Sequence, residues 1–176
     1  EAARVVNCAG TYAPEIARMV GLDIPIDGYP IQVSITEAVA PLVKHLVYSA
    51  SEKLSLKQAA SGGLMIGGGW PALQDPITGR LAVDPASLKA NLQVAQAVVP
   101  AVADLQLLRT WVASVSGSDD WKPVLGKVPG VPGFFMNAVP WLGFTAGPMA
   151  ARAVAQLLLD RDPGVDMTAF SAGRYQ

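Results

Sequence analysis

The residues of this chain best suited to chemistry gather near its C-terminus, in the run Trp141-Leu142-Gly143-Phe144-Thr145-Ala146-Gly147-Pro148, ahead of an apolar stretch that reaches Asp160. Pro148 predicts the first residue of a helix, because its fixed φ suits a helix and its missing N–H would be unpaired there in any case. The N–H groups around Gly143 to Gly147 would then point out of a helix N-terminus, whose partial positive charge binds anions or electron-rich oxygens. The structural alternative is an ordinary tight turn before a helix.

The elements that must position this run are predicted from hydrophobic periodicity and from turn residues. Helices are expected at Thr11–Val20, from Asp84-Pro85 to about Pro100, and from Pro148 to Leu159. Short apolar or alternating runs predict strands at Arg4–Cys8, Ile31–Glu37, His45–Ser49, Leu54–Gln58, Leu64–Gly68, Gln106–Ser116, Val124–Gly126 and Phe134–Met136. The first strand is expected in a parallel sheet, and the fourth and fifth as a hairpin. This pattern predicts an α+β fold with mainly antiparallel strands.

Composition excludes several classes of function. The 176 residues fit one domain; 51% are hydrophobic, 15% are charged and the formal net charge is −1, which argues against nucleic acid as a partner. The lone cysteine, Cys8, and the lone histidine, His45, lack metal-ligand spacing, so no metal is expected. We expect Cys8 to be a buried small residue and His45 a half-exposed strand residue. No apolar run reaches the length of a membrane span and no signal peptide is found, so a cytoplasmic location is expected.

The chain begins at Glu1 without a methionine and enters a strand almost at once, which suggests a fragment or a processed chain.

Short motifs follow one another along nearly the whole chain. They are Val5-Val6-Asn7-Cys8-Ala9-Gly10, Gln32, Gly67-Gly68-Gly69-Trp70, Trp111, Asp120-Trp121-Lys122-Pro123-Val124-Leu125-Gly126, Gly133-Phe134-Phe135, Gly143-Phe144-Thr145 and Phe170-Ser171-Ala172-Gly173-Arg174-Tyr175. In this order and spacing they resemble the C-terminal half of FAD-dependent amine oxidoreductases of the D-amino acid oxidase, glycine oxidase and sarcosine oxidase type. Leu54-Ser55-Leu56-Lys57-Gln58 ahead of the glycine-rich run is most similar to the flavin subunits of multi-subunit opine, sarcosine or hydroxyproline dehydrogenases.

The resemblance implies a division of the chain. Residues 29–123 would form a substrate-binding domain on an antiparallel sheet, and residues 1–28 with 124–176 would be the last pieces of an FAD-binding Rossmann-type domain. The G-x-G-x-x-G fingerprint of such domains is absent, and Gly67-Gly68-Gly69 does not fit it. The missing N-terminal FAD-binding half is therefore an expected partner, and the chain alone is expected to be inactive. Other subunits of a dehydrogenase complex are further expected partners.

The resemblance also implies FAD as cofactor and a small amine or amino acid as substrate. In this family the flavin accepts a hydride equivalent from the C–H bond beside the amine, and the imine then hydrolyses. The match in position implies that the cofactor-binding residues are Ala9, Gly10, Trp141, Leu142, Gly143, Phe144 and Thr145. No side chain is identified as catalytic.

Two positions depart from the family pattern. Val115 stands where the family often has an arginine that holds the substrate carboxylate, and Ala138-Val139 stand where Gly-His is frequent. Lys57, Arg109 and Lys122 are the possible substitutes for the arginine, each with the alternative of a solvated surface charge.

Three tryptophans beside glycine or proline loops, Trp70, Trp121 and Trp141, are candidates for the wall of an apolar substrate pocket. Core or interface packing is the alternative for all three. For the whole chain, the alternative to an enzyme half is a truncated, non-catalytic domain that binds a protein partner and has lost flavin. The two departures and the missing fingerprint favour this alternative, whereas Gly143-Phe144-Thr145 favours the enzyme.

Overall fold

The computed structural model describes residues 1–175, which form two compact units. The first unit holds Glu1–Tyr29 and the segment from Val115 onward, and the second holds Pro30–Ser114. No helix within the described part of the chain is long and apolar enough to cross a membrane.

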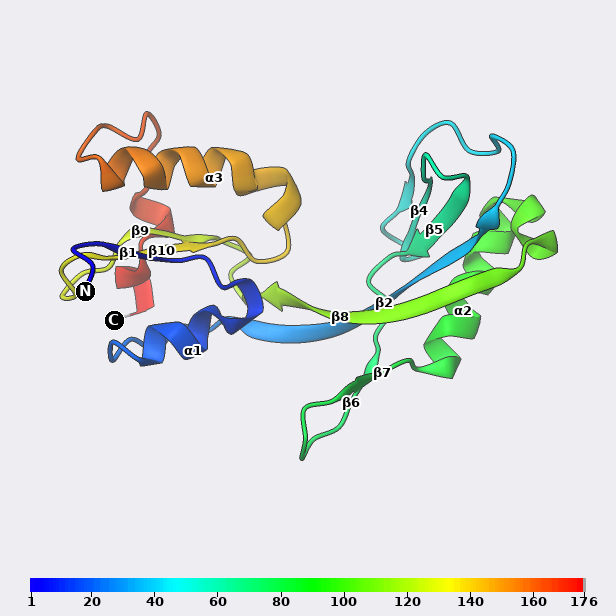
Figure 1. Ribbon diagram of the computed structural model, residues 1–176, viewed down its shortest axis with the longest axis horizontal. Helices are drawn as coiled ribbons and strands as arrows, with labels where there is room; N and C mark the ends of the chain where they lie inside the picture. The colour runs from blue at the N-terminus through cyan, green and yellow to red at the C-terminus, as the bar shows by residue number, and fades with distance from the viewer. Residues whose placement is uncertain (176) are drawn as a thin grey trace. The chain divides into compact units, whose positions relative to one another are not determined.

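The first unit is built on a three-stranded sheet in the order β1 (Val5–Asn7), β10 (Phe134–Ala138), β9 (Val124–Lys127). β1 pairs with β10 in parallel, as expected for the first strand, and β10 pairs with β9 antiparallel. Figure 1 shows α3 (Gly143–Leu158) on one face of this sheet and α1 (Ala13–Arg18) on the other.

The alternation of side chains along β10 explains why helices cover both faces. Phe134 and Met136 pack in a cluster with Ala13 and Ala17 of the α1 side, whereas Phe135 packs with residues of α3. Because successive side chains of a strand point to opposite faces, one short apolar strand supplies both cores. Three short 3₁₀ helices complete the unit, at Gly10–Tyr12, Thr168–Phe170 and Ala172–Tyr175.

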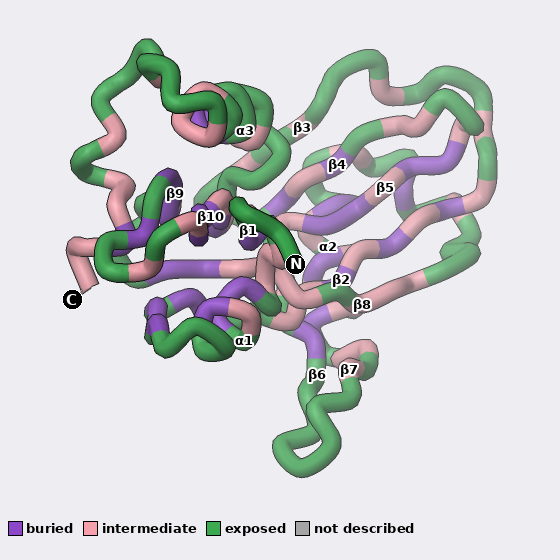
Figure 2. Tube along the Cα trace, turned by 60° about the vertical axis from the view of Figure 1, so that its left-hand side comes forward, coloured by how far each residue is buried: buried purple, intermediate pink, exposed green. Residues whose placement is uncertain are grey.

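The second unit contains most of a five-stranded sheet in the order β3 (Val47–Ser49), β4 (Leu54–Gln58), β5 (Gly63–Gly67), β2 (Asp27–Ala38), β8 (Leu107–Gly117). The first residues of β2 and the last of β8 belong to the first unit. β4 and β5 form the predicted antiparallel hairpin. Helix α2 (Pro85–Val98) and a 3₁₀ turn at Pro100–Asp104 close over the apolar face of the sheet, and Figure 2 shows the buried stretches of β4 and β5.

Asp84 caps α2 as its sequence predicted. Its carboxylate accepts hydrogen bonds from the Ala86 N–H at 2.9 Å and the Ser87 hydroxyl at 2.8 Å. The buried side chain of Gln32 in β2 bonds both backbone groups of Asp84, at 2.9 and 3.1 Å, so the start of α2 is tied to the sheet. Hydrogen bonding offsets the cost of burying this amide.

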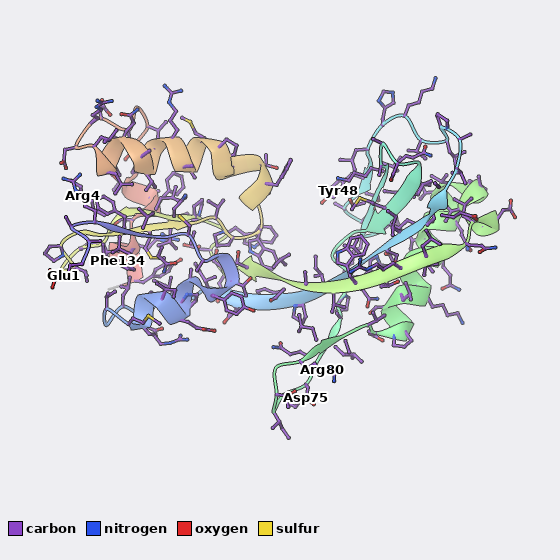
Figure 3. The ribbon with its side chains drawn as sticks, in the orientation of Figure 1. Glu1, Arg4, Tyr48, Asp75, Arg80 and Phe134 are labelled. Carbon is purple, nitrogen blue, oxygen red and sulfur yellow. The ribbon has the colours of Figure 1, made fainter. Side chains whose placement is uncertain are left out.

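A second hairpin, β6 (Leu73–Gln74) with β7 (Leu81–Ala82), was not predicted from the sequence. Asp75 lies at the turn of this hairpin (Figure 3). Its carboxylate closes the turn by accepting hydrogen bonds from the N–H groups of Ile77 at 2.9 Å and Thr78 at 2.7 Å. Two-residue strands carry almost no periodic pattern, so only this turn chemistry signals the hairpin.

The α+β class and the mainly antiparallel pairing are confirmed. Three local expectations are wrong. His45 is exposed and lies before β3, Cys8 is exposed, and β2 begins at Asp27, four residues before the strand predicted from Ile31. Cys8 is exposed because β1 ends at Asn7, whose buried amide bonds the Ala13 carbonyl at 2.8 Å and turns the chain away from the core.

Candidate functional site

The start of α3 leaves backbone donors unpaired. The first hydrogen bond within the helix runs from the Ala146 N–H to the Leu142 carbonyl at 2.8 Å. The N–H groups of Gly143, Phe144 and Thr145 therefore have no acceptor inside the helix. They lie where the helix dipole places partial positive charge, and the Phe144 side chain beside them is 99% exposed.

The helix begins earlier than predicted. Pro148 does not open α3 but lies inside it, five residues after Gly143. A proline there cannot donate to the Phe144 carbonyl, and its ring crowds that carbonyl. Figure 1 accordingly shows the first turn of α3 set at an angle to the rest of the helix. The unpaired donors predicted at this run remain, but they belong to residues 143–145, not to residues up to 147.

A stack of three aromatic rings lies directly ahead of α3. The ring centre of Trp141 lies 4.7 Å from that of Tyr29, with the two planes tilted by 38°, and 5.0 Å from that of Trp121, on which it stacks with the planes 21° apart. Trp141 is further held by the end of β8, because its backbone N–H donates to the Ser116 carbonyl at 2.9 Å and its Nε1–H to the Ser118 carbonyl at 3.1 Å. We call Tyr29, Trp141 and Trp121 the aromatic stack.

Gly117 makes the aromatic stack possible. A Cβ at this position would lie 2.3 Å from the Trp141 ring and 2.4 Å from the Tyr29 ring, distances that no side chain tolerates. The backbone of β8 therefore comes close enough to support the rings only because residue 117 has no side chain.

Both tryptophans of the stack have left-handed backbone conformations, with φ of 58° at Trp121 and 61° at Trp141. For bulky residues this region is uncommon and costs on the order of 1–2 kcal/mol each. Such strain persists only where surrounding contacts fix it, and it concentrates at functional sites.

Asp120, the residue before Trp121, is clamped by the C-terminal segment. Its carboxylate accepts hydrogen bonds from Arg174 Nε at 2.8 Å, from the Tyr175 hydroxyl at 3.2 Å and from the Lys122 N–H at 3.0 Å. Partial burial alone would raise the pKa of Asp120, but the hydrogen bonds and the charge of Arg174 lower that pKa to about 2. The carboxylate is therefore ionised at neutral pH and pairs with the guanidinium.

The end of β1 offers a second stretch of accessible backbone, at Ala9 and Gly10. The Ala9 N–H donates to the Asn7 side chain at 3.1 Å, and Gly10 has a φ of 58°, which favours glycine. A Cβ on Gly10 would meet no atom within 4 Å, and the same holds for Gly143. Open space at both glycines leaves room for a ligand to approach the backbone.

Asn137 of β10 is a residue that sequence analysis missed. Its Oδ1 is buried without a hydrogen-bond partner among the described residues. A buried acceptor without a donor is costly, so the atom calls for a ligand or a water. Nothing in the local sequence distinguishes this asparagine from one on the surface. Asp120 and Arg174, by contrast, lie within the motifs that carry the family resemblance.

The candidates in the second unit have contacts of their own. Lys57 is exposed on β4, and half-buried Trp70 donates its Nε1–H to the Lys53 carbonyl at 2.7 Å. A Cβ on Gly68 would lie 1.8 Å from that same carbonyl oxygen, so the glycine-rich run allows a close approach of backbone to backbone. Arg109 is exposed and lies over the Trp111 ring, 6.0 Å from its centre.

The structure thus brings Trp121 and Trp141 together in the first unit, beside the exposed Lys122. That Trp121 binds substrate together with Lys57 and Trp70 stays a prediction. Within residues 1–175, no group of three or more His, Cys, Asp or Glu side chains is arranged to hold a metal ion.

Comparison with known proteins adds a family match. A family model described as FAD dependent oxidoreductase (DAO) matches residues 1–157. The chain is 25% identical to the beta chain of sarcosine oxidase from Rhizobium meliloti over 99% of its own length and 41% of that protein. It is 26% identical to the glycine oxidase of Pseudomonas aeruginosa, over 97% of its own length and 46% of that enzyme. It thus spans less than half of these curated relatives.

The fold is also found in solved structures. The L-proline dehydrogenase from P. horikoshii superposes with a TM-score of 0.87 and 24% identity, covering 98% of this chain and 46% of that one.

Proposed function

The chain belongs to the DAO family of FAD dependent oxidoreductases, and from this premise we propose that it is part of an enzyme that oxidises the C–N bond of a small amine or amino acid to an imine. The observation that carries the proposal is the set of N–H groups at Gly143, Phe144 and Thr145, which have no acceptor inside α3 and follow directly on Trp141 of the aromatic stack.

The residues present fit FAD, the cofactor of this family. The N–H groups at the start of α3 are donors for the electron-rich edge of a flavin, Asn137 offers a buried acceptor, and the glycines at positions 10 and 143 leave the space that a ring or a pyrophosphate needs. When bound, FAD supplies the hydride-accepting chemistry. The chain contributes fixed dipoles that favour negative charge at the flavin edge and need no reorganisation.

We assign cofactor binding to the residues that the family resemblance implied, which are Ala9, Gly10 and the run from Trp141 to Thr145. In the proposed enzyme residues 1–28 and 124–176 complete the FAD-binding domain, and residues 29–123 bind substrate. The two compact units of the fold divide at Tyr29/Pro30 and at Ser114/Val115. In the proposed enzyme an N-terminal half supplies the dinucleotide fingerprint.

On the substrate side we propose Lys57, Trp70 and Trp121. Val115 cannot donate a hydrogen bond to a carboxylate, and a buried carboxylate without donors is costly. Lys57 is an exposed ammonium on β4, able to meet such a carboxylate as a point charge. The relatives' names support this substrate class, because glycine is an amino acid and sarcosine is its N-methyl derivative. The sarcosine oxidase relative is itself one chain of a larger assembly, which supports further subunits as partners.

The alternative of a non-catalytic module finds no support in the comparisons, since these relatives are oxidases or parts of them.

The decisive experiment is the visible spectrum of the natural protein that carries residues 1–176, purified without added cofactor. Flavin absorbance that bleaches when a small secondary amine or amino acid is added without oxygen is the expected result. A colourless protein that gains no flavin absorbance on incubation with FAD would overturn the proposal.

A further inference from the structure

Trp121 is connected to the backbone donors of α3 by an unbroken set of contacts. Its ring stacks on Trp141 with 5.0 Å between ring centres, and Trp141 stands two residues before Gly143, where α3 begins. Only Leu142 separates Trp141 from the start of the helix, so a shift of the Trp141 ring would also shift the helix start.

The other side of Trp121 is also fixed. The Trp121 N–H donates to the Ser118 carbonyl at 3.2 Å, and the preceding Asp120 is held by Arg174 and Tyr175. The Arg174 side chain also donates to the Lys122 carbonyl at 3.2 Å, so the C-terminal segment holds the side chain of the residue before Trp121 and the backbone of the residue after it. The ring is thus held by its neighbours in sequence and by the aromatic stack.

Stability of the fold does not explain this tryptophan. Trp121 is 65% exposed, so it removes little apolar surface from water, and its backbone is in the left-handed region that disfavours bulky residues. A glycine would adopt the same φ without strain and would keep the backbone hydrogen bond. What glycine would lose is the contact with Trp141.

We propose that Trp121 is a positioning residue whose ring, by fixing Trp141, holds the N–H groups of Gly143, Phe144 and Thr145 in the orientation that the flavin requires. The inference rests on the proposed function. In this role Trp121 acts through Trp141. The role is additional to its proposed place in the wall of the substrate pocket.

Trp121→Gly in the natural, flavin-containing protein is the test variant. The strain relief predicts an unfolding temperature that is unchanged or raised. The looser Trp141 predicts about tenfold weaker FAD binding, equal to roughly 1.4 kcal/mol, and a more negative flavin midpoint potential, because the donors no longer favour negative charge at the flavin edge.

Two further variants make the comparison specific. Trp121→Phe keeps a ring for stacking and should restore most of the affinity and potential. Lys53→Gly replaces another non-glycine residue with positive φ, 51°, and should leave both quantities unchanged. If Trp121→Gly loses its fold, Trp121→Leu takes its place, since it keeps apolar volume and loses the stack.

The outcomes separate the two proposals. A flavin-loaded Trp121→Gly protein with the affinity and potential of Lys53→Gly would overturn the positioning role alone. A wild-type protein that binds no flavin would overturn the proposed function and, with it, this inference.

Discussion

The ring of Trp141 lies 5.0 Å from the ring of Trp121, with their planes 21° apart, at the point where the chain leaves β10 and enters α3. Trp141 also donates both its backbone and its indole N–H groups to carbonyls at the end of β8 and just beyond it. The loop ahead of α3 is therefore fixed through both its backbone and its side chain. Donors held this firmly suit a site where orientation decides rate.

Gly143→Val is expected to slow flavin reduction by substrate at least ~10-fold in the natural protein. A Cβ at position 143 meets no atom of the chain, so the fold accepts the side chain, whereas a flavin against the helix start does not. Loss of one such donor typically costs roughly 10²–10³ in rate. Stopped-flow reduction without oxygen measures the change, and Gly147→Ala, also in open space, is the control. Unchanged reduction with intact flavin content would show that this loop does not face the flavin.

Residues 1–176 produced alone are expected to bind FAD weakly or not at all. The dinucleotide fingerprint, which places the pyrophosphate on a helix N-terminus, is absent from this chain. Titration of the isolated chain with FAD, followed by flavin fluorescence, measures the affinity. A dissociation constant near or below ~1 μM, about −8.2 kcal/mol, contradicts the prediction.

Lys57→Met is expected to raise KM for an anionic amino acid much more than for a neutral amine. The exposed ammonium on β4 is the proposed partner of the carboxylate in place of Val115. Loss of a charge-assisted hydrogen bond should cost the anionic substrate on the order of 1–3 kcal/mol. Lys89→Met, at another exposed lysine, should change neither KM. Equal effects of Lys57→Met on both substrates would make Lys57 a surface residue and favour amines without a carboxylate.

Acid is expected to weaken the clamp on Asp120 only at low pH. Partial burial raises the pKa of Asp120, but hydrogen bonds and the charge of Arg174 outweigh it and set the folded pKa at about 2, whereas an unfolded aspartate titrates near ~3.9. Below about pH 4 the unfolded chain therefore binds more protons at this site, and stability falls as the pH drops toward 2. Melting temperatures from pH 2 to 5 should show this loss in wild type and in the Asp119→Asn control. The same series for Asp120→Asn should be flatter; an identical slope would contradict the assignment.

Local signals predicted much of the fold. The β4–β5 hairpin follows from two apolar runs with a glycine-rich turn between them, and α2 follows from Asp84 and Pro85 at its start. These features are encoded within a few residues, where propensity and capping decide the structure. The start of α3 was not predicted correctly, because Pro148 is a strong signal for the first turn of a helix and yet lies inside α3, five residues after Gly143.

The candidate site was predicted only in part. Gly143 and Trp141 could be named from their motif, but their supports come from distant positions. Tyr29 reaches Trp141 across more than a hundred residues, and Arg174 reaches Asp120 across 54 positions. One sequence carries no record of such pairs, and an exposed Cys8 or an unpaired Asn137 depends on where a strand ends and what lies over it.

The parallel pairing of β1 with β10 has a consequence for biosynthesis. Val5 lies opposite Phe134, so the first unit cannot complete its sheet until residues far down the chain have been made. The second unit is one continuous segment, Pro30–Ser114, which contains the β4–β5 hairpin and the helix that covers it. Long-range pairings form slowly, whereas chains are made from the N-terminus at about 5–20 residues per second. We therefore expect the second unit to fold on the ribosome before β10 has been made and can pair with β1.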